Sequence, residues 1–247
     1  METSLMPPPP ARPDVPTVSW RWWEAIPIFL IGSVLAGLAA APAIAIVHSN
    51  KLEDLTLALA GEFGIGGTTF LWLWLWHRRS MGQIGVPERP GREIGVGVLG
   101  GVGLYLGGVF VVGAIVVSIL HQASHHVVHS PRQIPNHLSA GQLVLAGITV
   151  LIAAPIAEEL LFRGFLFRAL RAKHRFVFAG IVSALCFGAV HYSGGAWQNA
   201  LLLPIVMTFV GFGLAWLYER RGNIVANMAA HATFNVIGFI FIVTLNT

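Results

Sequence analysis

Residues 143–167 read LVLAGITVLIAAPIAEELLFRGFLF, and this stretch decides the fold. It is long and apolar enough to cross a lipid bilayer, which takes about 20 residues. Yet it carries two adjacent carboxylates, Glu158 and Glu159, each of which costs about 2.5–3.5 kcal/mol near the middle of a membrane helix. The Leu, Ile and Val residues before the pair return only about 0.3–0.6 kcal/mol each. The rest of the protein must therefore compensate the two charges, and an ionisable pair kept against this penalty indicates a functional site.

The sequence on both sides of this stretch predicts a polytopic membrane protein. Hydrophobic residues make up 55% of the 247 residues, charged residues only 11%, and the mean hydropathy is +0.71. We predict an all-α, transmembrane helical bundle of about seven spans, with six to eight compatible with the pattern, because the third run is long and the fifth is short. The apolar runs cover residues 25–47, 55–76, 94–120, 142–165, 176–192, 199–217 and 224–245.

The basic residues assign a side of the membrane to each end of the bundle. Of the 15 Lys and Arg residues, all but Lys51 and Arg132 precede the first run, or fall at the end of every second run or in the connection after it. The positive-inside rule then places the N-terminus in the cytoplasm and, with seven spans, the C-terminus outside. The net charge of +4 comes from these connections, so it indicates contact with anionic lipid and does not argue for a nucleic-acid partner.

We divide the chain into a tail and one membrane domain. Residues 1–23 begin with a proline-rich, polar stretch, and we expect them to form a disordered cytoplasmic tail. Residues 24–247 are expected to form a single transmembrane helical domain. Within it, Gly97/Gly101 and Gly103/Gly107 have the spacing that lets membrane helices approach closely, which we interpret as packing inside the bundle.

Helical spacing separates the roles of the two carboxylates. Glu159 and Arg163 are four residues apart, so they share a helix face and can form an ion pair. Glu158 points about 100° away and has no cation at either position that a helix would bring close. We therefore interpret Glu158 as a lone carboxylate suited to act as a general base on water.

Pro155, one turn earlier, frees a backbone carbonyl. Glu62, in the second run, is a third intramembrane carboxylate, for which we expect a supporting role.

Two further polar motifs interrupt apolar runs. The fifth run ends in FGAVH at His191, and HATFN in the seventh run places His231 and Asn235 on one helix face. Together with Glu158 they supply a base, an imidazole partner and two donors for a developing oxyanion. These are the parts of an enzyme that hydrolyses an amide with activated water. Counted from the cytoplasmic ends at about 1.5 Å per residue, His191 lies more than a turn away from the depth of the others.

Taken together, the three motifs resemble the signature of the CPBP family (CAAX protease and bacteriocin-processing, also called Abi) of intramembrane proteases. They occur in the family's order and on separate predicted helices. The resemblance covers residues 142–247, which we take as a protease-like core. The motifs are E-E-x-x-x-R at 158–163, F-x-x-x-H at 187–191 and H-x-x-x-N at 231–235.

The resemblance implies a role for each motif residue. Glu158 would activate water with the help of His191. His231 and Asn235 would bind the scissile carbonyl or its oxyanion, and the Glu159–Arg163 pair would support the site.

The resemblance leaves the cofactor open. Glu158, His191 and His231 could form a Zn²⁺ site of one carboxylate and two imidazoles with an open position. The sequence contains no HExxH motif, however, and a Glu–His pair can activate water unaided. We therefore favour metal-independent chemistry slightly.

The leading hypothesis is a multi-pass intramembrane endopeptidase of the cell membrane. Its partners would be the lipid bilayer and a membrane peptide or lipidated protein substrate, of which the family's prenylated CaaX peptides are one class. Two other classes of protein stay open. A non-enzymatic membrane scaffold or bacteriocin self-immunity protein would keep the polar cluster for binding. A transporter would use the carboxylates and histidines to relay protons, although the sequence shows no inverted repeat. The sequence does not indicate an oligomeric state.

Overall fold

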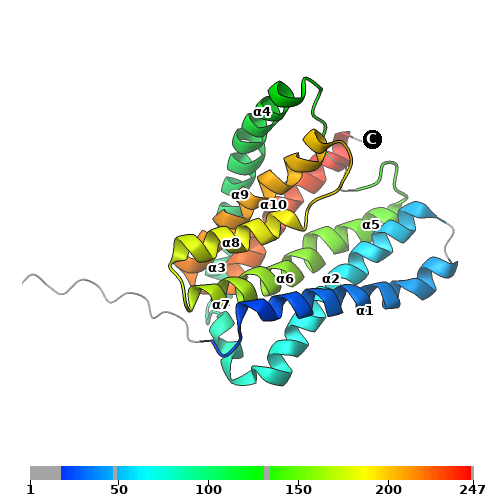
Figure 1. Ribbon diagram of the computed structural model, residues 1–247. Helices are drawn as coiled ribbons and strands as arrows, with labels where there is room; N and C mark the ends of the chain where they lie inside the picture. Colours follow the sequence, from blue (N-terminus) through cyan, green and yellow to red (C-terminus); the bar gives the residue numbers. More distant parts are fainter. Residues whose placement is uncertain (1–17, 47–48, 131–133, 246–247) are drawn as a thin grey trace, which may run out of the picture.

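The computed structural model describes residues 18–46, 49–130 and 134–245, and the regular structure of these residues is entirely helical (Figure 1). Several segments join end to end, so that residues 90–124 and residues 140–171 each form one continuous helix. Short 3₁₀ segments, η1 (Trp22–Glu24) and η2 (Arg78–Ile84), lie outside these helices. The other elements are α1 (Ala25–Ile46), α2 (Asn50–Trp76), α3 (Pro90–Tyr105), η3 (Leu106–Gly113), α4 (Ala114–Ser124), α5 (Ala140–Ile148), η4 (Thr149–Ala153), α6 (Ala154–Glu159), η5 (Leu160–Phe167), α7 (Arg168–Arg171), α8 (Phe176–Ala189), α9 (Trp197–Arg221) and α10 (Ile224–Leu245).

The predicted polytopic bundle is confirmed. Across the described residues, 5 helices are long and apolar enough to cross a membrane. α8 is apolar but has only 14 residues. α2 is long enough at 27 residues, but its first half carries four charged side chains, including Glu62. Counting these two, the continuous helices correspond one to one to the seven predicted runs.

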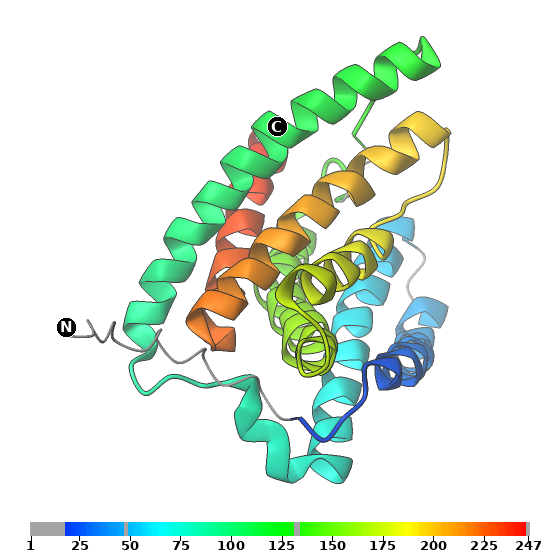
Figure 2. The ribbon, with the colours of Figure 1, turned by 60° about the vertical axis from the view of Figure 1, so that its left-hand side comes forward.

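Three helix pairs surround the continuous helix 140–171, which we call the central helix. The most extensive contacts between elements join α1 to α2, α3 to α10 and α8 to α9. Figure 2 shows the long helix of α3, η3 and α4 running beside α9 and α10 along one side of the bundle. The central helix contacts all three pairs, and so the side chains of Glu158 and Glu159 lie where the pairs meet.

Glycines bring the backbones within each pair together. A Cβ atom on Gly97 or Gly101 of α3 would collide with a carbonyl oxygen of α10, and one on Gly64 of α2 would collide with Gly32. The prediction that Gly97 and Gly101 pack inside the bundle is confirmed. Gly103 meets nothing within 4 Å, so the prediction was wrong for this residue, which points away from neighbouring helices.

The basic connections gather at one end of the bundle, as the charge pattern predicts. Arg168 of the central helix donates to the carbonyl of Gly222, and Arg221 of α9 pairs with Glu93 of α3. Lys51, one of the two exceptions, lies at the other end, where it donates to the carbonyl of Asn136 at 2.8 Å. The assignment of these ends to the cytoplasm and the outside stays a prediction.

The segment before α1 is attached to the central helix. The indole nitrogen of Trp20 donates to the carbonyl of Phe165 at 2.9 Å, and the two rings stack 5.5 Å apart. Glu24 then accepts hydrogen bonds from Trp72 and His77, both at 2.8 Å. Residues 18–23, which the sequence placed in a tail, therefore pack onto the bundle. The rest of the expected disordered tail, residues 1–17, lies outside the described residues.

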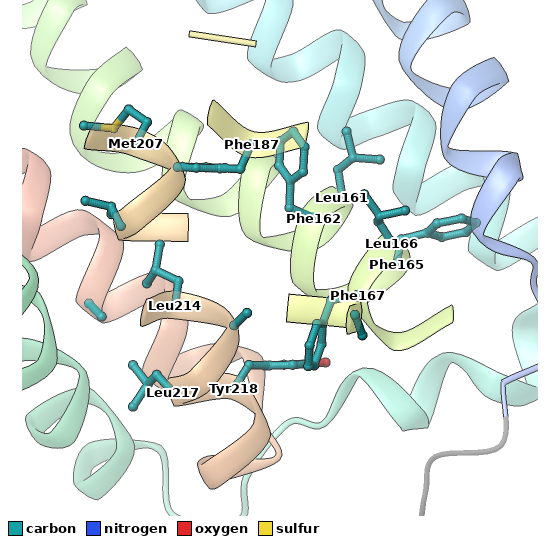
Figure 3. Close-up of a cluster of buried hydrophobic side chains, with 14 of the residues drawn as sticks. Leu161, Phe162, Phe165, Leu166, Phe167, Phe187, Met207, Leu214, Leu217 and Tyr218 are labelled. Atoms are coloured by element: carbon teal, nitrogen blue, oxygen red, sulfur yellow. The ribbon is translucent and has the colours of Figure 1, made fainter. Parts of the chain in front are cut away.

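Aromatic side chains fix the central helix against α8 and α9. Figure 3 shows Phe162 of η5 beside Phe187 of α8, and Phe167 beside Tyr218 of α9. Both pairs are edge-on, with ring centroids 5.3 Å and 6.0 Å apart, the arrangement that aromatic rings favour. This packing holds the segment that follows the carboxylates in a single position.

Candidate functional site

The two carboxylates lie at the end of α6, a six-residue α-helical segment between two π-helical segments. In a π-helix each N–H bonds to the carbonyl five residues earlier, and Ala154 bonds to Thr149 in this way. The next residue is Pro155, which has no N–H and so cannot bond to Val150. The amide nitrogen of Asn235 donates to the carbonyl of Val150 instead, at 2.8 Å. The carbonyl that Pro155 leaves free in this π-helical register is therefore occupied by a residue of the third motif.

Glu159 is the centre of a buried polar cluster. Its Oε1 atom accepts from Arg163 at 2.8 Å and from Nδ1 of His231 at 2.9 Å. Its Oε2 atom accepts from the amide of Asn227 at 3.2 Å. Glu159, Arg163 and Asn227 are fully buried, and His231 is 4% exposed. The ion pair predicted from the spacing of Glu159 and Arg163 forms, and it is further held by two groups from α10.

Arg163 is held by three kinds of contact. Besides Glu159, it donates to the carbonyl of Gly211 in α9 at 3.1 Å, and its guanidinium lies 4.3 Å from the centre of the Phe187 ring. A buried charge is tolerated only when it is paired and hydrogen-bonded. Arg163 therefore compensates Glu159 and ties the central helix to α8 and α9.

Glu158 has no such partner. Its Oε2 atom is buried and accepts no hydrogen bond from any described residue. The nearest basic atom is Nε2 of His231, at 3.9 Å, which is too long for a direct hydrogen bond. Two atoms at this separation can both bond to one water molecule at about 2.8 Å from each. The geometry agrees with the interpretation of Glu158 as the unneutralised carboxylate.

His231 links the two carboxylates. Glu159, paired with Arg163, is ionised and can only accept, so Nδ1 of His231 carries the proton between them. The Nε2 atom is left to face Glu158. In catalytic and metal sites, a hydrogen bond to one ring nitrogen of a histidine likewise fixes which nitrogen faces the ligand.

His191 is less closely associated with the site than the sequence suggested. α8 ends at Ala189, before His191, and the connection that follows contains Gly194 and Gly195, both at positive φ. The His191 Nδ1 atom bonds to the carbonyl of Phe187 at 2.7 Å. The Phe187 ring lies 4.9 Å from the His191 ring and 5.7 Å from that of His231. His191 is thus connected to the cluster by packing against the Phe187 ring, which also contacts His231. Among the described residues, no ion pair joins His191 to a carboxylate.

Among the described residues, the three predicted Zn²⁺ ligands are not assembled around one point. Within residues 18–46, 49–130 and 134–245, no three His, Cys, Asp or Glu side chains come together as ligands of one ion. Glu158 and His231 approach each other, but His191, the third ligand of the predicted Zn²⁺ site, is not placed with them. The slight preference for metal-independent chemistry, with Zn²⁺ as the alternative, stays a prediction.

Sequence reasoning missed Asn227. Its amide donates both to Glu159 and, at 2.7 Å, to the carbonyl of Leu214. The sequence does contain a signal for this residue. Polar side chains recur at intervals of four residues along α10, which places Asn227, His231 and Asn235 in one stripe on the helix.

Comparison with known proteins agrees with the three motifs. Residues 140–237 match the family model described as "Type II CAAX prenyl endopeptidase Rce1-like". "Putative membrane peptidase YdiL" of Bacillus subtilis (strain 168) is 42% identical over 84 residues, which are 34% of this chain and 32% of that protein. "UPF0177 protein YaiF" of Lactococcus lactis subsp. lactis (strain IL1403) is 31% identical over 134 residues, 53% of this chain and 56% of that protein.

The matches with these curated relatives thus span between about a third and just over half of their length. No solved structure matches the chain significantly. The family model, however, includes all three motifs and both helices that form the polar cluster. Residues 140–237 of this multi-pass membrane protein therefore match the Rce1-like family, in agreement with the resemblance of the three motifs to the CPBP family.

Proposed function

We propose that the protein is an intramembrane endopeptidase in which Glu158 activates water to hydrolyse a peptide bond of a membrane-associated substrate. One observation carries this proposal: the Oε2 atom of Glu158 is buried, has no hydrogen-bond partner among the described residues and lies 3.9 Å from Nε2 of His231. A carboxylate that is left without a cation while its neighbour Glu159 has one is available to take a proton from water. The family match supports a protease of the CAAX type.

In the first step, water adds to the scissile carbonyl. Glu158 takes one proton from the water as its oxygen bonds to the carbonyl carbon, and the carbonyl oxygen becomes an oxyanion. His231, whose proton is held on Nδ1 by Glu159, faces this centre with Nε2, which can accept a hydrogen bond from the second O–H of the water and orient it. Asn235 uses one of its two amide hydrogens for Val150, and the second can donate to the oxyanion.

In the second step, the C–N bond breaks. Glu158 returns its proton to the leaving nitrogen, so that an amine and a carboxylic acid are released and Glu158 is ionised again. His191, whose ring contacts the same Phe187 ring as His231, would assist the water or the substrate from the α8 side. We assign Glu159, Arg163 and Asn227 to holding His231 in position.

For the substrate, we propose a lipidated or transmembrane peptide presented from the bilayer of the cell membrane. The description of the family model names a CAAX prenyl endopeptidase, so a prenylated C-terminal CaaX peptide is the first class to test.

The proposal is tested with purified protein in lipid vesicles and a library of fluorogenic peptides, prenylated, acylated and transmembrane. Glu158→Gln should lower kcat by about 10²- to 10⁴-fold, the usual contribution of a general base, while the thermal unfolding curve is retained. Glu88→Gln is the matched control, because it makes the same chemical change at an exposed position.

Two outcomes would contradict the proposal. If Glu158→Gln cleaved as fast as Glu88→Gln, Glu158 would not be the base. If the wild type cleaved no peptide and Glu158→Gln kept the biological phenotype, a scaffold or self-immunity protein would explain the cluster better.

A further inference from the structure

Glu62 of α2 lies beside the proposed site, although α2 is outside the residues that match the family model. The contact between α2 and α6 is close at this level. A Cβ atom on Gly66 would lie 2.9 Å from the Cβ atom of Ala157, the residue before Glu158. Glu62 is one turn from Gly66 on the same face of α2. The helix packing thus brings a third carboxyl group toward Glu158.

Neither carboxyl group is satisfied by the protein around it. The Oε2 atoms of Glu62 and Glu158 are both buried, and both lack a hydrogen-bond partner among the described residues. The two charges are close enough to repel each other. The local cation, Arg163, bonds directly to Glu159 and is therefore already engaged. His231, the other basic group, faces Glu158 and Glu159.

Two desolvated carboxylates that lie near each other without a bound cation cannot both stay ionised at low cost. One of them keeps a proton, and the proton gives it an O–H donor for the other. If Glu158 acts on water it must be the ionised member, which leaves Glu62 as the neutral acid. This step rests on the proposed function.

We propose that Glu62 is a positioning residue of the site, which as a neutral acid donates a hydrogen bond to Glu158 and fixes the direction of its reactive oxygen. The bond would occupy one oxygen of Glu158 and leave the other for water beside His231. The proton of Glu62 is not consumed in the reaction, so the balance of the hydrolysis is unchanged. The site would then depend on α2 as well as on the central helix, α8 and α10.

The test compares Glu62→Leu and Glu62→Gln in the peptide cleavage assay. Glu62→Leu removes the donor and should lower kcat about tenfold, the worth of one hydrogen bond of average strength, with KM little changed. Glu62→Gln still donates from its amide and should recover most of that loss. Glu88→Leu makes the first change at an exposed position and serves as the control.

The outcomes separate this inference from the proposed function. If Glu158→Gln abolishes cleavage but Glu62→Leu cleaves as fast as Glu88→Leu, the endopeptidase assignment stands and the role of Glu62 is refuted. If Glu62→Gln is as slow as Glu62→Leu, a neutral donor is refuted.

A measurement without substrate keeps the inference testable if no peptide is cleaved. Thermal unfolding of Glu62→Leu, Glu158→Gln and the double variant forms a double-mutant cycle. Non-additive shifts in midpoint temperature support the contact, whereas shifts that are additive within error overturn it. Infrared spectra give a direct check, since the carbonyl band of a neutral carboxyl group should disappear in Glu62→Leu.

Discussion

Replacing Arg163 by methionine removes the cation that compensates Glu159. Arg163→Met keeps a long apolar stem but loses the 2.8 Å bond to Glu159, the 3.1 Å bond to the carbonyl of Gly211 and the contact with Phe187. Removing one partner of a fully buried ion pair destabilises a protein by about 3–5 kcal/mol, because the other charge stays buried without compensation. For a chain of this size, each kcal/mol of lost stability lowers the midpoint temperature of unfolding by about 2–4 °C. The expected decrease is therefore roughly 6–20 °C.

The measurement is thermal unfolding in detergent micelles, followed by the fluorescence of the 8 tryptophans. Arg171→Met is the matched control. Its ion pair with Glu219 has the same kind of geometry, at 2.9 Å, but the two side chains are 19% and 25% exposed. Partly exposed pairs contribute about 0–1 kcal/mol, so this variant should unfold close to the wild type.

A double variant sharpens the prediction. Glu159→Gln together with Arg163→Met removes both charges, so much of the stability lost in Arg163→Met should return. The reasoning is refuted if Arg163→Met unfolds no earlier than Arg171→Met, or if the double variant unfolds earlier than Arg163→Met alone.

Three other predictions concern the second partner of Glu159, the helix contacts and the cofactor. Asn227→Leu should destabilise the protein by about 1–3 kcal/mol, because it leaves an oxygen of Glu159 without a donor, and should lower kcat; an unchanged midpoint and rate would contradict this. Gly101→Val should reduce the yield of monodisperse protein in size-exclusion chromatography, because its side chain would collide with Ala230, whereas Gly103→Val faces open space and should behave as the wild type. Chelators should leave cleavage unchanged and elemental analysis should find less than one Zn²⁺ per chain; loss of activity that Zn²⁺ restores would show a metal enzyme.

The helical bundle and the buried ion pair could be predicted because both follow from local spacing. An apolar run of bilayer length forms a helix whatever its neighbours do, and Glu159 and Arg163 meet within one turn of one helix. The partners of His191 and Asn235 could not be predicted in this way. The contacts of His191 depend on where α8 ends, and α8 stops at Ala189 although the apolar run continues past it. Asn235 bonds to the carbonyl of Val150 because η4, the segment before α6, is π-helical. The spacing of apolar residues does not reveal this change of helix register.

The close backbone contacts within α1–α2, α3–α10 and α8–α9 have a mechanical consequence. Where main chains touch at glycines, two helices have no side chains between them that could rearrange, so we expect each pair to move as one stiff body. Glu158 is on the one continuous helix that belongs to no pair, while His231 and Glu62 belong to different pairs. A small shift of one pair against another therefore alters the distances between these three side chains and leaves the geometry inside every pair intact.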